Sequence, residues 1–448
     1  MFFINFALSN GNTRLWVRQK QDYEVRVLIV STSEKTGGAA VAANRLCEAL
    51  NNNGVKAKML VRDKETEDIT VAELPRSWKL RWNFLWERWC IFLRLHLSRK
   101  NLFAIDIANA GTDITRLPEF KEANVIHLHW VNQGMLSLKN IRKIIDSKKP
   151  VVWTMHDIWP ATAICHITLG CRKFTSTCHH CKYLPGGGGD NDLSATVWQQ
   201  KKKAFKGKNI CFVTCSRWLE TEAKASALLK GEKITSIPNP INTHVFTKTN
   251  QHEARQQLGL PGDKKILLFV SQRATNRNKG MDYLVAACQQ LAQHHPEMKE
   301  KLAIAILGGH SEEVIDDLPF KAFPLGYISD EQRIVSVYNA ADVFILPSLD
   351  DNLPNTIMEA MACGLPCVGF KVGGIPEMID HQKNGYVAQY KSTDDLEKGI
   401  QWVLTEADYE TLSANAMKKV ASAYSQQSVA MRYINVYHDL MAQKQYFL

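Results

Sequence analysis

Short apolar runs alternate with polar, glycine-containing loops and helical stretches along most of the chain. Runs that are apolar throughout are typical of strands buried on both faces of a parallel sheet. They predict strands in both halves of the sequence, at residues 25–30, 124–130, 150–157, 209–216 and 233–237, and then at 265–270, 302–307, 341–348 and 367–370. Because helical stretches separate the runs, the pattern predicts an α/β protein with two parallel-sheet domains.

The two halves meet at Pro238-Asn239-Pro240-Ile241-Asn242, whose prolines predict a rigid, non-helical joint. The length of 448 residues fits two or three domains. We expect an extension without periodicity, an N-terminal domain, a hinge, a C-terminal domain and a terminal helix, at residues 1–22, 23–237, 238–246, 247–424 and 425–448.

Composition and charge narrow the class of protein. With 45% hydrophobic and 22% charged residues, the chain has the composition of a soluble globular protein. No uncharged apolar stretch reaches about eighteen residues and the opening segment has no basic leader, so neither a membrane-spanning helix nor a secretory signal is expected. Eleven cysteines, several inside apolar strands, favour a reducing cytoplasm. The net charge of +10 suits anionic partners.

The stretch Leu346–Ile379 predicts a strand, a loop and a helix twice in succession. Asn355-Thr356 offers capping side chains for the first helix, and Gly373-Gly374 permits a tight turn before the second. Two helix N-termini would then face one crevice, which suits an anion. Asp351 and Glu359 can both face that crevice. The alternative is that Glu359 stabilises its helix dipole and Asp351 is a turn residue.

Loops after other strands carry candidate ligands for phosphate and for a base. Gly37-Gly38 lies directly before a predicted helix, so its backbone amides can approach a ligand, although its spacing matches no GxGxxG, GKS or GKT motif. Arg273 and Lys279 precede a helix at residues 281–293 and can grip a diphosphate. The alternative for both cations is a solvated basic loop. Residues 323–328 predict a short exposed segment with backbone groups for a base.

Histidines follow two predicted strands of the first half. His127 and His129 alternate on one face of a strand, and His156-Asp157 ends the next strand along the chain. A histidine at a strand end is more often structural than catalytic. Since the carboxyl ends of parallel strands share one sheet edge, these residues should lie near Gly37-Gly38, which favours a ligand site.

Residues 77–103 interleave four tryptophans with six Lys or Arg residues and one Glu. Helical spacing gives an aromatic side and basic margins, formed by Trp78, Trp82, Leu85, Trp86, Trp89, Phe92 and Leu93 and by Arg81, Arg88, Arg94 and Lys100. A basic amphipathic helix with aromatic anchors suits an anionic membrane surface. The alternative is a core helix packed on the sheet, with its arginines reaching solvent.

Four cysteines lie on one short insertion at residues 165–181, and they are Cys165, Cys171, Cys178 and Cys181. The spacing of Cys178 and Cys181 is that of a zinc knuckle, and four thiolates can close a tetrahedral structural site. The first pair lacks knuckle spacing, and further candidate ligands are His166, His179 and His180. Disulfides or free thiols are the alternatives. The DND sequence at residues 190–192 lies in a glycine-rich loop, so its match to a DxD metal motif is attributed to chance.

The C-terminal half resembles the retaining glycosyltransferases of family 4, which have the GT-B fold of two Rossmann-like domains facing a central cleft. The motifs are Arg273-x5-Lys279-Gly280, DNLPNTIMEAMACGLP with its two acidic residues, and VGGIPEMI followed by NGYV. The resemblance covers residues 23 to about 441. HLHW, HDIWP and the cysteine-rich insertion further resemble a subgroup that builds bacterial exopolysaccharide, capsule and lipopolysaccharide, including colanic acid transferases.

The resemblance implies a donor-binding site made of Gly37, Gly38, Arg273, Lys279, Tyr327, Ile328, Asn355 and Glu359. Within it, Arg273 and Lys279 bind the diphosphate and Glu359 binds the ribose hydroxyls. The backbone of residues 326–328 contacts the base.

Two residues are implied in catalysis. Asp351 takes the place of the family's first glutamate, which contacts the donor sugar, and its side chain is shorter by one methylene. His156 matches the histidine placed near the transferred sugar and the acceptor. No protein nucleophile stands out, so a front-face displacement assisted by the leaving phosphate is expected, with no cofactor required. A structural zinc is the one candidate metal.

The resemblance implies a hexosyltransferase of cell-surface polysaccharide biosynthesis. It would move a sugar from a UDP- or GDP-linked donor to a lipid-linked or lipopolysaccharide-type saccharide, with retention, from the cytoplasm at the inner face of the membrane. The rivals are a GT-B sugar-nucleotide epimerase or hydrolase and a non-catalytic, zinc-stabilised protein that binds nucleotide sugar. No nucleic-acid partner is expected, because the basic residues cluster with tryptophans and no recognition motif accompanies them.

Overall fold

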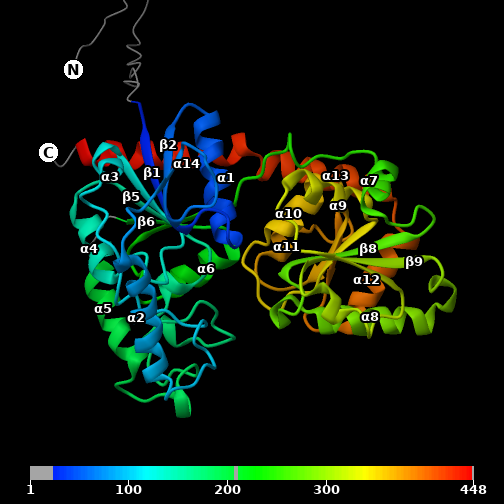
Figure 1. The fold of residues 1–448 in the computed structure, drawn as a ribbon, viewed down its shortest axis with the longest axis horizontal. Coiled ribbons are helices and arrows are strands. Elements are labelled where there is room, and N and C mark those ends of the chain that lie inside the picture. The colour runs from blue at the N-terminus through cyan, green and yellow to red at the C-terminus, as the bar shows by residue number, and fades with distance from the viewer. Residues whose placement is uncertain (1–23, 206–209, 446–448) are drawn as a thin grey trace, which may run out of the picture.

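The computed structural model describes residues 24–205 and 210–445, and the predicted extension at residues 1–22 lies outside them. Figure 1 shows two lobes side by side, one coloured blue to green and the other green to orange. Each lobe is built on one parallel sheet flanked by helices. This arrangement confirms the predicted α/β class with two parallel-sheet domains.

The N-terminal sheet has seven strands in the order β3-β2-β1-β4-β5-β6-β7, and the C-terminal sheet has six in the order β10-β9-β8-β11-β12-β13. The first set is β1 Arg26–Ser33, β2 Lys56–Asp63, β3 Val71–Glu73, β4 Val125–Leu128, β5 Val151–Met155, β6 Ile210–Thr214 and β7 Lys233–Ser236. The second set is β8 Lys265–Arg273, β9 Leu302–Gly309, β10 Lys321–Gly326, β11 Val343–Leu346, β12 Cys367–Phe370 and β13 Gly385–Ala388.

Helices connect the strands in both lobes. Those of the N-terminal lobe are α1 Gly38–Asn52, α2 Trp78–Arg94, α3 Pro118–Glu122, α4 Leu138–Asp146, α5 Leu193–Phe205 and α6 Arg217–Ala225. Those that follow are α7 Gln251–Leu258, α8 Met281–His294, α9 Glu331–Ala340, α10 Asn355–Ala362, α11 Ile375–Met378, α12 Thr393–Thr405, α13 Tyr409–Ala423 and α14 Gln426–Gln445. Among the helices of the described residues, none has the length and apolar content needed to cross a bilayer.

Both sheets place their first strand in the middle, with the winding reversed on either side. β1 pairs with β2 and β4, and β8 pairs with β9 and β11, all in parallel. In open α/β sheets, ligands bind outside the carboxyl ends of the strands at this switch point. The loops after β1, β8 and β11 are therefore the places where both lobes can hold a ligand.

Each predicted apolar run contains a strand, but four strands, β2, β3, β10 and β13, were not predicted. β1 continues to Ser33 because Thr32 is buried and its hydroxyl donates to the carbonyls of Trp130 and Asn132. The predicted exposed segment at residues 323–328 is largely the edge strand β10, after which Tyr327 is exposed.

The chain crosses between the lobes twice, and the crossings lie side by side. The Ile241 amide donates to the Tyr424 carbonyl at 2.8 Å, and the Gln426 amide donates to the Ile241 carbonyl at 3.1 Å. Helix α14, red in Figure 1, then returns to the N-terminal lobe. Its apolar face joins the core of that lobe through Val429, Ala430, Tyr433, Tyr437 and Leu440. The predicted hinge at residues 238–246 is thus one of two paired connections.

Candidate active site

A cleft of about 210 Å³ lies between the two lobes. Its N-terminal wall is formed by the loop after β5 and by the start of α6, and it includes His156, Asp157 and Trp218. Its C-terminal wall follows β8 and β11 and includes Lys279 and Asp351. Since these are the carboxyl ends of strands in both sheets, the cleft occupies the position that the topology favours for a ligand.

The predicted diphosphate ligand Lys279 and the predicted sugar ligand Asp351 form an ion pair. The Lys279 Nζ atom lies 2.5 Å from the Asp351 Oδ2 atom, which also accepts from the Ser348 hydroxyl at 3.1 Å. Gly280 adopts φ +78°, and a side chain there would collide with the Pro347 carbonyl. The close approach of these two loops therefore holds Lys279 over the end of β11.

The loop at Gly373-Gly374 packs against the loop at residues 350–353. A Cβ atom at Gly373 would lie 1.7 Å from the Asp351 carbonyl oxygen, and one at Gly374 would lie 1.9 Å from the Asn352 carbonyl oxygen. The Gly374 amide donates to the Asp351 carbonyl at 3.2 Å. These glycines position Asp351 by contact between backbones, rather than by offering a free turn to a ligand as the sequence suggested.

His156 lines the cleft, but partners in its own lobe occupy both of its ring nitrogens. Its Nε2 atom lies 2.9 Å from His129 Nδ1, and its Nδ1 atom lies 3.5 Å from the Cys215 thiol. Burial lowers the pKa of His156 to about 4, which keeps the ring neutral at physiological pH. Contact between a ring nitrogen and a sugar would require the ring to turn away from these partners.

The other two predicted histidines are buried structural groups. His127 lies between the Tyr437 hydroxyl at 2.8 Å and the Thr154 hydroxyl at 2.7 Å, so it connects β4 to α14. His129 is also buried and supports His156. Only His156 and Asp157 of this predicted group line the cleft, because α14 covers the sheet beside His127.

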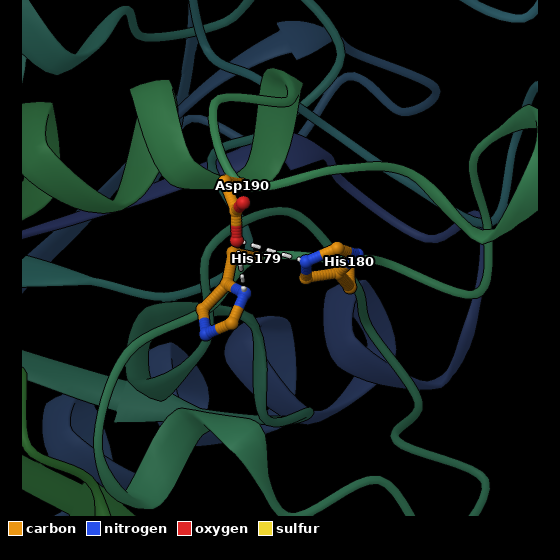
Figure 2. Close-up of side chains that lie close together, drawn as sticks. All are labelled: His179, His180 and Asp190. Atoms are coloured by element: carbon orange, nitrogen blue, oxygen red, sulfur yellow. Dashed lines mark hydrogen bonds and ion pairs between the residues drawn. The ribbon is translucent and has the colours of Figure 1, made fainter.

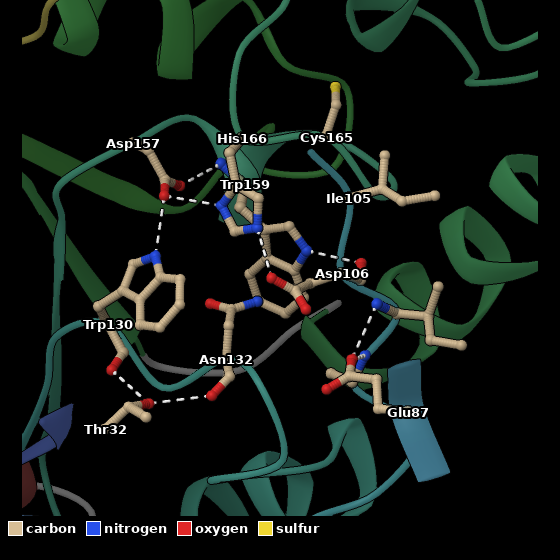
Figure 3. Close-up of polar contacts among 12 residues, drawn as sticks. Thr32, Glu87, Ile105, Asp106, Trp130, Asn132, Asp157, Trp159, Cys165 and His166 are labelled. Atoms are coloured by element: carbon tan, nitrogen blue, oxygen red, sulfur yellow. Dashed lines mark hydrogen bonds and ion pairs between the residues drawn. The ribbon is translucent and has the colours of Figure 1, made fainter. Parts of the chain in front are cut away.

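A chain of charged residues, partly buried at His166 and buried at Asp106 and Arg88, supports Asp157, and Figure 3 shows most of it. His166 lies 2.8 Å from Asp157 Oδ2 through its Nδ1 atom and 2.6 Å from Asp106 Oδ2 through its Nε2 atom. Asp106 in turn pairs with Arg88. Only the protonated imidazole has an N–H on both nitrogens, so that form donates to both carboxylates.

Asp157 is oriented by three donors. Besides His166, its carboxylate accepts from the Trp130 indole N–H at 3.0 Å and from the Trp159 amide at 2.8 Å. Burial alone would raise the pKa of Asp157, but the charge and hydrogen bond of His166 and the two other donors hold it below its ordinary value. Asp157 is therefore a fixed, ionised carboxylate at the cleft surface. The motif HDIWP contained Asp157, but nothing local indicated its connection to His166.

Asp350 also lines the cleft, and its carboxylate has no hydrogen-bond or ion-pair partner among the described residues. Burial and the neighbouring charge of Asp351 raise the pKa of Asp350 to about 6, against the smaller effect of Lys279. No motif in the sequence pointed to Asp350. Its position next to Asp351 was the available signal.

The predicted ribose ligand Glu359 lies in the interface between the lobes. It is buried, with its Oε1 atom 2.8 Å from Arg45 of α1 and its Oε2 atom accepting from the Tyr338 hydroxyl at 2.8 Å. The Arg45 guanidinium also stacks over the Phe246 ring at 4.8 Å. A ribose would thus have to compete with Arg45 for this carboxylate.

Asn355 joins the two lobes and does not cap α10, so the predicted capping role is wrong. The helix is preceded by Pro354, and no side chain caps it. The Asn355 amide donates to the Gly38 carbonyl at 3.0 Å and accepts from Asn239 at 2.9 Å. The structure therefore does bring Gly38 and Asn355 together, with Gly37 at φ +93° beside them.

The remaining predicted donor ligands are exposed at the C-terminal lobe. Arg273 ends β8, and its guanidinium lies 3.1 Å from His310 Nε2. Tyr327 is exposed and Ile328 half-buried directly after β10. None of these three lines the cleft that holds Lys279.

Further contacts close the lobes around the cleft. The Ser216 hydroxyl donates to the Asn352 side chain at 2.5 Å, and that side chain donates to the His156 carbonyl at 3.2 Å. The Glu377 carboxylate accepts from the amides of Arg217 and Trp218 at 2.9 and 2.7 Å. It thereby caps the N-terminus of α6 from the opposite lobe, which fixes Trp218 at the cleft.

The cysteine-rich insertion carries the predicted zinc ligands. All four cysteines are half-buried free thiols. Burial, followed by smaller effects that include the neighbouring thiols, raises the pKa of Cys165 to about 12 and of Cys178 to about 11. Within the described residues, the group of three potential ligands whose donor atoms lie within 4.8 Å of one another is His179, His180 and Asp190, drawn in Figure 2. The four thiols do not form such a group, and their zinc site stays a prediction.

A buried lysine lies beside these thiols. Lys201 of α5 donates to the carbonyls of Trp159 and Thr162 at 2.6 and 3.0 Å. Burial lowers the pKa of Lys201 well below its ordinary value, and the sites of Cys165 and Cys178 act in the opposite direction. Two or more thiolates on a metal would supply negative charge next to the Lys201 amino group and favour its protonated form, which would suit the predicted zinc site although the four thiols are not gathered into one ligand group.

Helix α2 turns its tryptophans to solvent, so the alternative of a core helix is wrong. Trp78, Trp82, Trp86 and Trp89 are 72%, 55%, 44% and 51% exposed, and Leu85 and Leu93 are exposed beside them. The buried side holds Glu87, Arg88 and Ile91. The prediction that Arg88 lies at the basic margin is therefore wrong, because Arg88 pairs with Asp106 inside the lobe.

Comparisons with known proteins agree with this architecture. The model of Glycosyltransferase Family 4 matches residues 36–245, and the model of Glycosyl transferases group 1 matches residues 250–420. An uncharacterised glycosyltransferase of Methanocaldococcus jannaschii is 26% identical over 76% of this chain and 91% of its own length. Other curated relatives, D-inositol 3-phosphate glycosyltransferases among them, are matched over only about half their length.

Solved structures share the fold along almost the whole chain. Sucrose-phosphate synthase of Thermosynechococcus elongatus has a TM-score of 0.64 at 21% identity and covers 94% of this chain and 100% of its own. The Anabaena protein HepE in complex with UDP-glucose has a TM-score of 0.59 at 16% identity, over 94% of this chain and 100% of its own.

Two facing Rossmann-like lobes with a cleft at their strand ends define the GT-B class. The chain belongs to the GT-B glycosyltransferases, with a family 4 domain followed by a group 1 domain.

Proposed function

We propose that the chain transfers a hexose, with retention, from a UDP- or GDP-linked donor to a lipid-linked or lipopolysaccharide-type saccharide in cell-surface polysaccharide biosynthesis. The observation that carries the proposal is the interlobe cleft in which Lys279, Asp351 and His156 meet. The complex of HepE with UDP-glucose, which has the same fold, supports a nucleotide-sugar donor.

The Lys279–Asp351 pair suggests how the donor is bound and activated. Cleavage of the sugar–phosphate bond builds negative charge on the leaving diphosphate, and a fixed cation in a closed cleft stabilises that charge. A donor diphosphate competes for Lys279 and frees Asp351 to accept hydrogen bonds from the sugar. Arg273, exposed at the end of the neighbouring strand β8, reaches the diphosphate by turning its guanidinium away from His310.

Two carboxylates that line the cleft are engaged by partners, which does not favour either of them as a nucleophile. Asp157 is held by three donors and Asp351 by Lys279 and Ser348. A front-face displacement fits this arrangement, with the leaving phosphate oxygen taking the proton of the acceptor hydroxyl as the new bond forms. Closure of the lobes excludes water, which would otherwise compete as an acceptor.

A donor screen tests this function. Purified protein is mixed with UDP-, GDP- and ADP-sugars, and thermal shift and slow release of nucleoside diphosphate are recorded. We expect one base to give both signals, and Lys279→Ala to lose at least tenfold in nucleotide affinity while the exposed control Lys299→Ala keeps it. Free sugar or an altered nucleotide sugar as the main product would favour the hydrolase or epimerase. Absence of any response would refute the transferase.

The exposed side of α2 supports a membrane-bound acceptor. We name Trp78, Trp82, Leu85, Trp86, Trp89 and Leu93 the tryptophan face. Arg81 and Arg94 are exposed on the same helix, which gives the face positive charge. A cavity of about 480 Å³ with Lys139 on its wall opens beside Trp82 and Trp86. We propose that the tryptophan face lies on the anionic inner face of the cytoplasmic membrane, where apolar burial and basic residues act together.

Vesicle sedimentation tests the membrane contact. Arg81→Glu with Arg94→Glu should release the protein from anionic vesicles, with about 1 kcal/mol lost for each basic residue near the surface. The matched control is Lys299→Glu with Lys301→Glu on the C-terminal lobe. Arg88 is left unchanged because it is buried. Equal retention of both double variants would contradict the membrane contact.

A further inference from the structure

Two histidines and one aspartate form a group at the surface of the cysteine-rich insertion, and Figure 2 shows their side chains. The residues are His179, His180 and Asp190, whose donor atoms all lie within 4.8 Å of one another. The described residues that line the interlobe cleft include none of the three. The group is therefore separate from the site of the proposed sugar transfer.

Both histidines face the same carboxylate oxygen. The Nε2 atom of His180 lies 2.9 Å from Asp190 Oδ1, and the Nδ1 atom of His179 lies 3.9 Å from it. A metal ion at about 2.1 Å from each ligand in tetrahedral geometry separates its ligand atoms by about 3.4 Å. The two distances lie on either side of that value, so small rotations of these side chains bring the atoms to the spacing of metal ligands.

The second histidine has an unused ring nitrogen. The Nδ1 atom of His179 is shielded from solvent and has no hydrogen-bond partner among the described residues. A buried polar atom without a partner costs free energy, and the carboxylate of Asp190 at 3.9 Å is too distant for a hydrogen bond. An ion pair between Asp190 and His180 alone leaves this nitrogen unsatisfied. A cation between the groups would bind the nitrogen and the carboxylate together.

Backbone contacts hold the two segments that carry the group. The His180 amide donates to the Gly189 carbonyl at 3.1 Å, and the Asp192 carboxylate accepts from the Cys181 amide at 2.9 Å. Gly188 has φ +71°, and a side chain there would collide with the Asp192 carboxylate. The glycine-rich loop is thus fixed against the segment of the two histidines, and the aspartate is positioned before any ion binds.

The donor atoms select the class of ion. Two imidazole nitrogens and one carboxylate oxygen suit Zn²⁺ and similar first-row divalent ions, whereas Mg²⁺ and Ca²⁺ prefer sites made of oxygen ligands. Asp192 does not join the group, because its carboxylate accepts from the backbone.

We infer that His179, His180 and Asp190 bind one divalent ion of the zinc class, in addition to the zinc predicted for the four cysteines. The ion joins residues 178–181 to the loop that precedes α5. The three side chains are 41%, 47% and 84% exposed, so water completes the coordination and the ion exchanges with solvent.

Cobalt titration of the full chain tests the inference. The protein is dialysed without chelator, so that tightly held metal stays in place, and Co²⁺ is added while absorption spectra are recorded. Histidine and carboxylate ligands give Co²⁺ weak visible bands, whereas thiolates add a strong charge-transfer band in the near ultraviolet. We expect uptake of about one Co²⁺ without the charge-transfer band, and its displacement by Zn²⁺ but not by Mg²⁺.

Variants assign the ion to the three residues. His179→Ala and Asp190→Asn should each weaken Co²⁺ binding at least about tenfold. The matched control is His295→Ala on the C-terminal lobe, which removes a histidine that lies 3.5 Å from one carboxylate, Glu297, and should leave the affinity unchanged. Asp190→Asn keeps the size of an exposed side chain, so it decides the result if His179→Ala does not fold.

Three results would overturn the inference. The first is no uptake of Co²⁺, or uptake with the charge-transfer band alone, which would leave the cysteines as the metal ligands. The second is an unchanged affinity in Asp190→Asn. The third is an equal loss of affinity in His295→Ala, which would mean that surface histidines bind the ion without selectivity.

Discussion

The two walls of the cleft are built in different ways. The C-terminal wall consists of backbone loops packed through glycines, with one partly exposed ion pair, Lys279–Asp351, at its surface. The N-terminal wall consists of side chains, and its cleft carboxylate Asp157 is held by His166 and, behind it, by buried charges. Where backbone contacts hold the wall, a ligand can replace the surface ion pair with little loss of stability. Where buried charges hold the wall, the geometry is fixed, but the loss of any one charged residue should destabilise it.

Removal of the predicted zinc should disturb the N-terminal wall more than any other change. His166, which holds Asp157, directly follows the predicted zinc ligand Cys165 on the insertion. We expect about one zinc per chain, held by Cys165, Cys171, Cys178 and Cys181. Structural zinc contributes on the order of 10 kcal/mol in small domains. Elemental analysis of purified protein measures the metal, and chelation should lower the thermal midpoint.

Substitutions of the candidate ligands show which residues bind the zinc. Cys178→Ser with Cys181→Ser should lose the metal, and Cys90→Ser, half-buried on α2 outside the insertion, should retain it. Zinc loss on replacing His179 and His180 instead would assign the ion to the group with Asp190. Folded protein without metal would remove the zinc prediction and leave the N-terminal wall to its charges alone.

Asp106→Ala tests the buried charges directly. Asp106 accepts from both Arg88 and His166, so its loss removes the closest carboxylate of a buried guanidinium and leaves Glu87 3.8 Å away as its remaining carboxylate. We expect the free energy of unfolding to fall by about 3–5 kcal/mol in urea titrations. The control is Asp113→Ala in the same lobe, which breaks a partly exposed pair with Lys143 and should cost less than about 1 kcal/mol. Similar losses in both variants would mean that the buried charges around Asp106 contribute no more to stability than the partly exposed pair of Asp113 and Lys143.

The difference between the two walls also explains which parts of the site could be predicted from the sequence. The C-terminal wall lies within Leu346–Ile379 and one loop after β8, so its strands and helices were predicted from local pattern, and Lys279 and Asp351 were singled out as ligands, although their pairing was not predicted. Strand β12 has the predicted bounds, and α8 begins where expected at Met281. Periodicity and turn chemistry act over a few residues, and that range is enough for this wall.

The N-terminal wall depends on contacts between distant segments. His166 meets a carboxylate 60 residues earlier in the chain, at Asp106, and no periodicity connects the two. Asn355 was predicted as a helix cap because its partner, the Gly38 carbonyl, lies 317 residues away. Arg88 was assigned to the surface because helical spacing shows which residues share a face and not which of two faces is buried. Tertiary contacts decided all of these cases.

Asp350→Asn tests whether the unpaired carboxylate lowers the stability of the protein. Unlike Asp106→Ala, this substitution should raise the free energy of unfolding. The folded-state pKa of about 6 exceeds the ordinary value of 3.8, so the folded protein holds this proton more tightly. The resulting stability is present below about pH 4 and is lost as pH rises through 6. Above pH 7 the wild type should be less stable than the variant by about 1–2 kcal/mol, a figure reduced from about 3 kcal/mol for partial exposure.

Urea titrations of both proteins from pH 4 to 8 measure this difference. The groups that act on Asp350 are Asp351, Lys279 and Tyr183, and the same substitution leaves them in place. A gap that grows between pH 4 and 6 and then levels off is expected. A constant gap would show that the change reflects packing, and the carboxylate would then have a partner in solution.

Lys279→Ala should have the smallest effect on stability, although it has a large one on donor binding. The pair it forms with Asp351 is partly exposed, so its loss should change the free energy of unfolding by less than about 1 kcal/mol. It also removes the one lysine among the described residues that line the cleft, which should raise the pKa of Asp350 further and make the fall in stability between pH 4 and 7 steeper. A loss as large as that of Asp106→Ala would mean that Lys279 holds the C-terminal wall together, and the distinction between the two walls would fail.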